Sequence, residues 1–133
     1  MSLKKIGLVG GLSWISTAEY YRLINEGVRH YLGGYNSAHI LLDSLNEQDF
    51  IDASLADPTD KKCEDLILES IDRLKRAGAE IFALCANGVH RFESAIKQET
   101  GVDVLNIAKA TAASISGMKQ KRVGILGVQK TME

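Results

Sequence analysis

The stretch IFALCANGVH, residues 81–90, decides the fold of this chain, because it joins an apolar run to the start of a helical pattern. Four apolar residues lead directly into Cys85, and a short apolar run bounded by turn residues predicts a buried β-strand. Ala86, Asn87 and Gly88 then favour a sharp turn. The stretch therefore predicts a strand that ends at a cysteine, followed by a turn and a helix.

A cysteine at such a turn has two interpretations. The N-terminus of a helix carries a partial positive charge, which lowers the pKa of a nearby thiol and makes it reactive. Alternatively, a free cysteine is often buried and packs as a small hydrophobic side chain. Residues 81–90 alone leave both interpretations open for Cys85. His90, five residues further along, either orients the thiol or packs within the following helix.

The rest of the chain alternates apolar runs with helical patterns. This alternation predicts an α/β three-layer sandwich, in which a mostly parallel sheet is flanked by helices on both faces. The five predicted strands are residues 6–9, 38–42, 80–85, 102–105 and 122–126.

Capping residues place the first two long helices. Residues 16–19 match a capping box, although Ser13 is an equally good cap for an earlier start of the same helix. Asp57 followed by Pro58 predicts the start of a second long helix, which Gly78 then ends. Both helices would lie against the sheet.

The second cysteine, Cys63, falls on the apolar side of that later helix. Its spacing from Ile67, Ile71 and Leu74 follows the helical period, so we expect it to pack in the core. Cys85 would then be the only thiol with rapid reactivity. The two cysteines have no metal-ligand spacing, so we expect free thiols, no metal site and a reducing cytoplasmic location.

Composition excludes several classes of partner. A chain of 133 residues forms about one domain and can bury a core without disulfides. Sixteen basic against seventeen acidic residues leave a net charge of −1, which provides no basic footprint for nucleic acid or an anionic membrane. No apolar run approaches the roughly 18 residues of a membrane span. We therefore expect no nucleic acid and no membrane partner.

Ligands of parallel sheets gather beyond the carboxyl ends of the strands, where residues 10–13, 44–46 and 85–88 arrive. The first of these loops lacks the G-x-G-x-x-G spacing of dinucleotide sites. Its backbone N–H groups and the Ser13 hydroxyl suit a carboxylate or another small anion. The alternative is that Gly10 and Gly11 only permit a tight turn between strand and helix.

Residues 6–25, IGLVGGLSWISTAEYYRLIN, resemble the opening of the aspartate/glutamate racemase family, whose members read G-G-x-S-W-E-S-T followed by Y-Y and I-N. The resemblance covers essentially the whole chain. It continues, in the same order, through residues 32–38, 77–80, 85–90, 123–127 and 130–132.

This resemblance implies a cofactor-independent amino-acid racemase or epimerase with two α/β lobes. Two cysteines on opposite faces of the substrate exchange its α-proton in such enzymes, and Cys85 corresponds to the cysteine of the first lobe. Asn87 and the neighbouring backbone at Gly88 would hold the substrate carboxylate, while Leu12 and Ser13 would line the pocket. The implied substrate is a small amino acid or dicarboxylate, and the implied cofactor is none.

The sequence departs from the family at three positions. Ile15 replaces a usual Glu, and Gly88 and Val128 each replace a usual Thr. We expect residues 4–117 to form the N-terminal lobe and residues 118–133 to begin a second lobe that is truncated, so no second catalytic cysteine is present. The isolated lobe is then expected to racemise poorly or not at all.

Two other functions remain open: a catalytically dead carboxylate-binding or regulatory lobe, and a flavodoxin-like nucleotide-binding domain. We also expect self-association, because an apolar strand at residues 123–126 needs neighbours on both faces. A twofold homodimer is the simplest such assembly.

Overall fold

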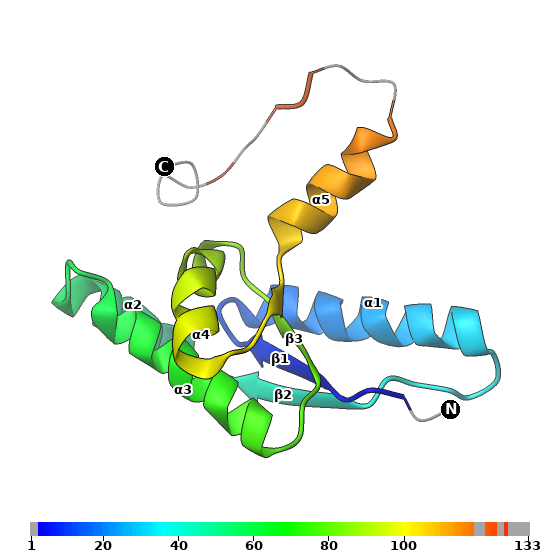
Figure 1. Ribbon diagram of the computed structural model, residues 1–133, viewed down its shortest axis with the longest axis horizontal. Helices are drawn as coiled ribbons and strands as arrows, with labels where there is room; N and C mark the ends of the chain where they lie inside the picture. The colour runs from blue at the N-terminus through cyan, green and yellow to red at the C-terminus, as the bar shows by residue number, and fades with distance from the viewer. Residues whose placement is uncertain (1–2, 119–121, 125–126, 128–133) are drawn as a thin grey trace.

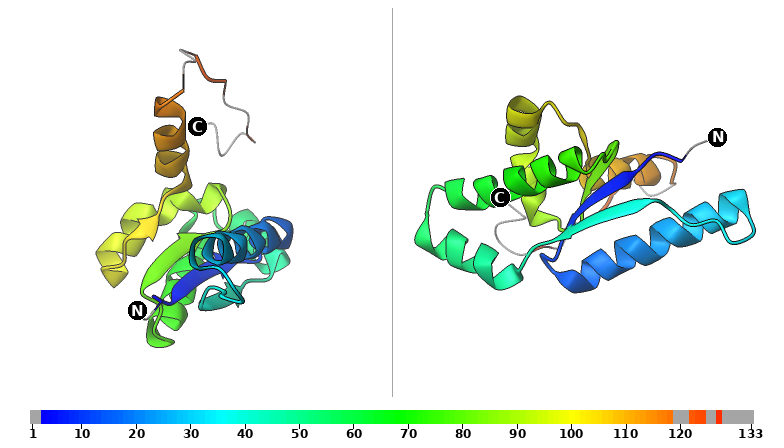
Figure 2. Two further views of the ribbon diagram at one scale, coloured as in Figure 1. Left: turned by 90° about the vertical axis from the view of Figure 1, so that its right-hand side faces the viewer. Right: turned by 90° about the horizontal axis from the view of Figure 1, so that it is seen from below.

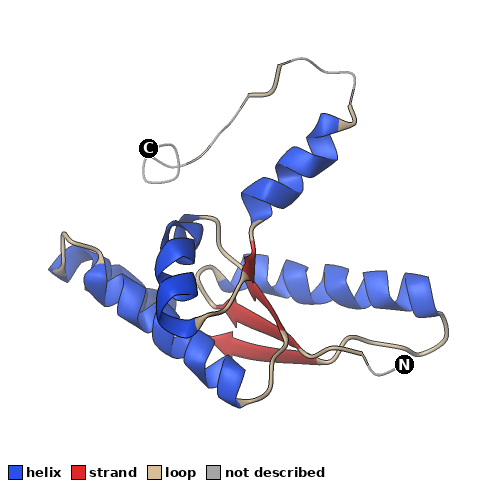
Figure 3. Ribbon diagram, in the orientation of Figure 1, coloured by secondary structure: helices blue, strands red, loops and turns tan. Residues whose placement is uncertain are grey.

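The computed structural model describes residues 3–118, 122–124 and 127. Within them, four parallel strands form one sheet in the order β2-β1-β3-β4, with helices packed on both faces (Figures 1 and 3). The strands are β1 (Ile6–Gly10), β2 (Ile40–Ser44), β3 (Ile81–Leu84) and β4 (Val104–Leu105). The parallel α/β sandwich predicted from the sequence is confirmed.

The predicted fifth strand is not found among the described residues. Residues 122–124 adopt no strand conformation, and residues 125–126 lie outside the described part of the chain. A run of apolar residues makes a strand only where a neighbouring strand offers hydrogen-bond partners. In the described residues β4 therefore forms one edge of the sheet and β2 the other.

The long helix α1 covers one face of the sheet, while α3 and α4 cover the other (Figure 2). Helix α5 extends away from the sheet (Figure 1). The helices are α1 (Trp14–Leu32), α2 (Glu47–Ala56), α3 (Lys61–Arg76), the short 3-10 helix η1 (Gly88–Phe92), α4 (Glu93–Thr100) and α5 (Ile107–Ser116).

Two hydrophobic clusters fill the two faces. Side chains alternate along a strand, so Val9 and Leu84 point toward α3 and α4, whereas Leu8 and Cys85 point toward α1. The apolar stripe of α3 is fully buried in the first cluster, as its spacing predicts: Cys63, Ile67, Ile71 and Leu74. The expectation of core packing for Cys63 is confirmed, and it lies on the opposite face of the sheet from Cys85.

Of the two alternatives for the start of the first long helix, the cap at Ser13 is confirmed, whereas the predicted start of the second long helix is wrong. Helix α1 begins at Trp14 with Ser13 as its N-cap, so residues 16–19 lie inside its first turns and form no capping box. Helix α3 begins at Lys61, because residues 57–60 form a turn in which an Asp57 carboxylate oxygen accepts from the Thr59 N–H at 3.0 Å. Short polar side chains satisfy turns and helix starts by the same hydrogen bonds, which makes the two hard to separate in sequence.

Helix α2 was not predicted, and its Phe50 and Ala53 are half-buried and pack against the core cluster. None of its residues is buried, and its N-cap Asn46 accepts from the Gln48 N–H at 3.3 Å. Two residues separate the helix from the end of β2, and it packs beside α3. Its position therefore depends on tertiary contacts.

Candidate active site

The sheet order brings three loops to one edge. Strand β1 lies between β2 and β3, so the connections after β1 and β3 diverge at the point where ligands collect in such sheets. The Cys85 N–H donates to Val9 O at 2.9 Å, and the Leu45 N–H donates to Gly10 O at 3.0 Å. The three loops predicted from the sequence, at residues 10–13, 44–46 and 85–88, therefore meet at this edge.

The glycines of the first loop permit close packing. Gly11 has a φ of +89°, and a Cβ atom there would lie 1.9 Å from Leu45 O. A Cβ atom on Gly10 would lie 2.4 Å from Thr17 Cγ2. Because neither glycine has a side chain, Leu45 and Thr17 can pack closely against this loop. This observation favours the tight-turn interpretation of the glycine pair over a cradle for a phosphate.

The start of α1 leaves its N-terminal dipole uncompensated. Ser13 is in extended conformation and its side chain caps none of the helix N–H groups, and the first turn contains no acidic residue. Thr17 stabilises the loop instead, since its hydroxyl accepts from the Gly11 N–H at 2.9 Å and lies 3.1 Å from Ser13 O. Free N–H groups at the start of a long helix favour an anion.

Ser16 connects this helix to the cysteine loop. Its hydroxyl lies 2.6 Å from Cys85 O and 2.9 Å from Ser13 O, so its one hydrogen serves both carbonyls. The contact spans 69 positions in the sequence and joins the two loops of the candidate site. Sequence reasoning missed this residue, because a serine in the first turn of a helix resembles any capping serine.

Cys85 is buried under α1. Only 1% of its surface is exposed, and it packs with Leu8 and Ala83 beside Tyr20 and Ile24. This burial raises the pKa of the Cys85 thiol to about 12.

Of the two interpretations left open for Cys85, burial favours the packed thiol over a thiol with a lowered pKa. The turn after Cys85 leads into the short helix η1, and α4 begins only at Glu93, so the thiol does not lie at the N-terminus of the helix that follows it in the chain. Burial also raises the pKa of Tyr20, and the charge of a Cys85 thiolate adds to that effect. The thiol lies in an apolar environment.

The carbonyl groups of residues 86–88 are all hydrogen-bonded, to His90 or Arg91. His90 Nδ1 lies 3.0 Å from Ala86 O, and the His90 N–H donates to Asn87 O at 3.2 Å. The guanidinium of Arg91 donates to Gly88 O. Asn87 itself is exposed and Gly88 is half-buried, so part of this turn is accessible to a ligand.

The other predicted pocket residues lie around this edge. Leu12 is half-buried and packs against the core cluster on the α3 face, while Ser13 is partly exposed. Ile15, where the family usually has Glu, is 61% exposed. Val128 lies outside the described residues.

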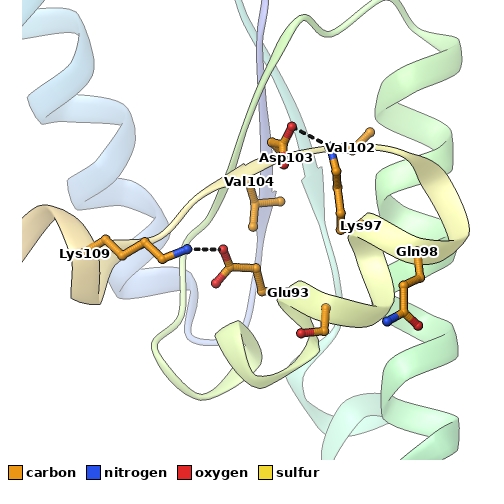
Figure 4. A pocket seen from close by; sticks show the side chains of 8 residues that line it. Glu93, Lys97, Gln98, Val102, Asp103, Val104 and Lys109 are labelled. Atoms are coloured by element: carbon orange, nitrogen blue, oxygen red, sulfur yellow. Dashed lines mark hydrogen bonds and ion pairs between the residues drawn. The ribbon is translucent and has the colours of Figure 1, made fainter.

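A separate hollow between α4, β4 and the start of α5 is unsuited to a carboxylate (Figure 4). Its lysines are paired with its own acids: Lys109 lies 2.8 Å from Glu93 and Lys97 lies 2.7 Å from Asp103. The described residues contain no cluster of histidine, cysteine and acidic side chains suited to a metal ion. No helix in the described ranges is long and apolar enough to cross a membrane.

A parallel sheet with a cysteine at its topological switch point defines the class of this protein: an α/β domain with a candidate thiol site at the carboxyl edge of the sheet. Residues 9–133 match the model of the Asp/Glu/hydantoin racemase family, so the chain belongs to that family.

Two solved structures support this assignment. A candidate Asp/Glu racemase from Yersinia pestis is 37% identical, with a TM-score of 0.89 over 98% of this chain and 56% of that one. An aspartate racemase homologue from Pyrococcus horikoshii is 28% identical, with a TM-score of 0.78 over 86% of this chain and 49% of that one. The chain thus spans about half the length of these relatives.

Proposed function

We propose that this chain is the N-terminal lobe of a cofactor-independent racemase that acts on a small acidic amino acid. Residues 4–117 form the lobe, and residues 118–133 begin the second one. Cys85 is the proton-transfer residue, and the backbone near Ser13 with Asn87 and Gly88 holds the α-carboxylate. The observation that carries the proposal is the meeting of Cys85, an uncapped helix start and the turn with the exposed Asn87 at one edge of the sheet.

The proposed chemistry is a balanced exchange of one proton. The Cys85 thiolate removes the α-proton and becomes a thiol, and a second thiol returns a proton to the opposite face of the same carbon. Cys63 cannot supply that second thiol, because it is buried on the other face of the sheet. The partner must come from another segment or another chain.

Substrate charge explains how a buried thiol can serve as a base. A pKa of about 12 leaves little thiolate at neutral pH. The ammonium group of a bound amino acid would lie next to the sulfur, and a nearby positive charge favours the thiolate. Burial then makes the thiolate a strong base once it forms.

Isotope exchange in deuterated water tests this function. The chain is incubated with L-aspartate or L-glutamate, and loss of the α-proton signal is followed together with the chirality of the amino acid. A single thiol should exchange the α-proton and retain the configuration. The Cys85→Ala variant should lose the exchange, and the matched Cys63→Ala variant should retain it. Equal exchange in both variants would exclude Cys85 as the base.

The raised pKa of Cys85 favours a second candidate function, a catalytically inactive carboxylate-binding or regulatory lobe. Succinate or aspartate should then shift the amide resonances of residues 12–16 and 85–88 without any α-proton exchange. A nucleotide-binding function is disfavoured, because Gly10 and Gly11 pack against Thr17 and Leu45 and leave no open cradle for phosphate. Shifts induced by a nucleotide but by no carboxylate would reverse this order.

The homodimer and the cytoplasmic location stay predictions. Helix α1 carries exposed apolar side chains that a second copy could cover, among them Trp14 at 67%, Tyr21 at 53% and Leu23 at 55%. Light scattering at micromolar concentration tests self-association, and a monomer throughout the concentration range would reject it. Both cysteines are free, which is compatible with a reducing compartment.

A further inference from the structure

The imidazole of His90 bridges two parts of the fold. Its Nδ1 lies 3.0 Å from Ala86 O and 3.2 Å from Asn87 O, and its Nε2 lies 3.3 Å from the N–H of Ile107. The first two contacts are in the turn after Cys85, and the third is at the first residue of α5. His90 therefore connects the turn of the candidate site to a helix that begins 17 positions further along the chain.

These partners determine the protonation of the ring. A backbone N–H can only donate, so Nε2 must be the unprotonated, accepting nitrogen. Nδ1 then carries the hydrogen and donates to a carbonyl oxygen, which is the only role that its two carbonyl neighbours allow. A rigid ring with one donor and one acceptor therefore forms hydrogen bonds to the turn and to the start of α5 at the same time.

A second contact holds the same helix start. The Glu93 carboxylate accepts from the Asn106 side-chain amide. It also lies 2.8 Å from Lys109 Nζ (Figure 4). Asn106 is the N-cap of α5, and its side-chain oxygen accepts from the Lys109 N–H at 3.1 Å. The start of α5 is thus held even without His90, so loss of the imidazole contact should leave the helix in place and act mainly on the turn.

We propose that His90 is a positioning residue for the candidate site, in which the neutral, Nδ1-protonated imidazole holds the turn at residues 86–87 against the start of α5. The link to ligand binding rests on the function proposed above. With the Ala86 and Asn87 carbonyls held by His90, the turn keeps the conformation in which the exposed Asn87 meets a carboxylate.

Two amide variants separate the two contacts. In His90→Asn, the amide nitrogen replaces Nδ1 and keeps the hydrogen bond to the turn, but the side chain is too short to reach Ile107. In His90→Gln, the amide oxygen replaces Nε2 and accepts from Ile107, while the donor to the turn is lost. His90→Phe preserves the ring shape and loses both contacts. The exposed His30, on α1, gives the matched control His30→Gln.

Nitrogen-detected spectra of the labelled chain read the tautomer directly. We expect an Nδ1-protonated ring at His90, a changed Ile107 amide in His90→Asn, and changed Asn87 and Gly88 amides in His90→Gln. Aspartate should bind about tenfold more weakly to His90→Gln and His90→Phe, the loss typical of one hydrogen bond in a site, and normally to His90→Asn and His30→Gln.

An Nε2-protonated ring, or weakening of aspartate binding equally in all three His90 variants, would overturn the proposal. If wild-type chain binds no aspartate, the proposed function fails. In that case the tautomer and the two amide responses still decide whether His90 holds the turn.

Discussion

Alkylation of the two cysteines as a function of pH tests the electrostatics of the candidate site. Burial raises the pKa of Cys85 to about 12, against 9.0 for an unperturbed thiol. At pH 7 the thiolate fraction of the folded chain should then be about 1000-fold below that of the unfolded chain, equivalent to about 4 kcal/mol. Since only the thiolate reacts, alkylation of Cys85 should be slowed by at least that factor.

The assay is iodoacetamide labelling followed by peptide mass mapping, with the folded chain compared with the chain in urea. Cys63 serves as an internal comparison, because burial and then the charge of Asp60 raise its pKa as well. Both thiols should therefore react slowly at pH 7, in contrast to the rapid Cys85 reactivity that the sequence predicts. Labelling of Cys85 in the folded chain within tenfold of its rate in urea would refute the reasoning from burial.

The same shift has a consequence for stability. A pKa that is higher in the folded state contributes stability that is fully present below the unfolded pKa, near 9, and is lost as the pH rises toward about 12. The free energy of unfolding should therefore fall through this alkaline range, beyond the contribution of other groups. Urea denaturation of wild type and Cys85→Ala between pH 8 and pH 10 isolates the part due to this thiol, and identical slopes would contradict the assignment.

Two further substitutions test the packing around the site. Gly11→Ala should destabilise the fold by several kcal/mol, since its Cβ would overlap Leu45 O. Gly27→Ala, in open space on α1, should instead stabilise the fold by about 0.5–1 kcal/mol. Urea denaturation compares the two variants, and similar changes in their free energy of unfolding would contradict this reasoning. Ile67→Ala should lower the free energy of unfolding by about 2–5 kcal/mol, because the side chain is fully buried. Leu55 is 80% exposed, so Leu55→Ala should change that free energy by less than about 0.5 kcal/mol. Thermal unfolding of the two variants tests this difference.

Local pattern was sufficient for the elements that bury a continuous apolar face. The run ahead of Cys85 predicts β3, and the period of Cys63, Ile67 and Ile71 predicts the buried side of α3, because a strand or helix in the core must present one apolar face. The parallel topology also follows from the alternation of strands and helices. These features depend on periodicity, which a sequence contains directly.

Only the tertiary structure determined those helices and strands whose position depends on contacts with other parts of the chain. Helix α2 buries no residue. For α1, the capping pattern at residues 16–19 and the alternative cap at Ser13 fit the sequence equally well. Local hydrogen bonding alone therefore could not place either helix start. The fifth strand was expected from an apolar run, but a strand exists only where a partner strand supplies hydrogen bonds.

For the candidate site, too, some features follow from the sequence and others only from the folded chain. The sequence by itself determined which residues arrive at the carboxyl edge of the sheet, since the order of elements brings Cys85 and the Ser13 loop there. It could not determine the pKa of the thiol, which follows from the burial of Cys85 under α1. Nor could it reveal Ser16 or the two-sided contacts of His90, because these hydrogen bonds join segments that only the folded chain brings together.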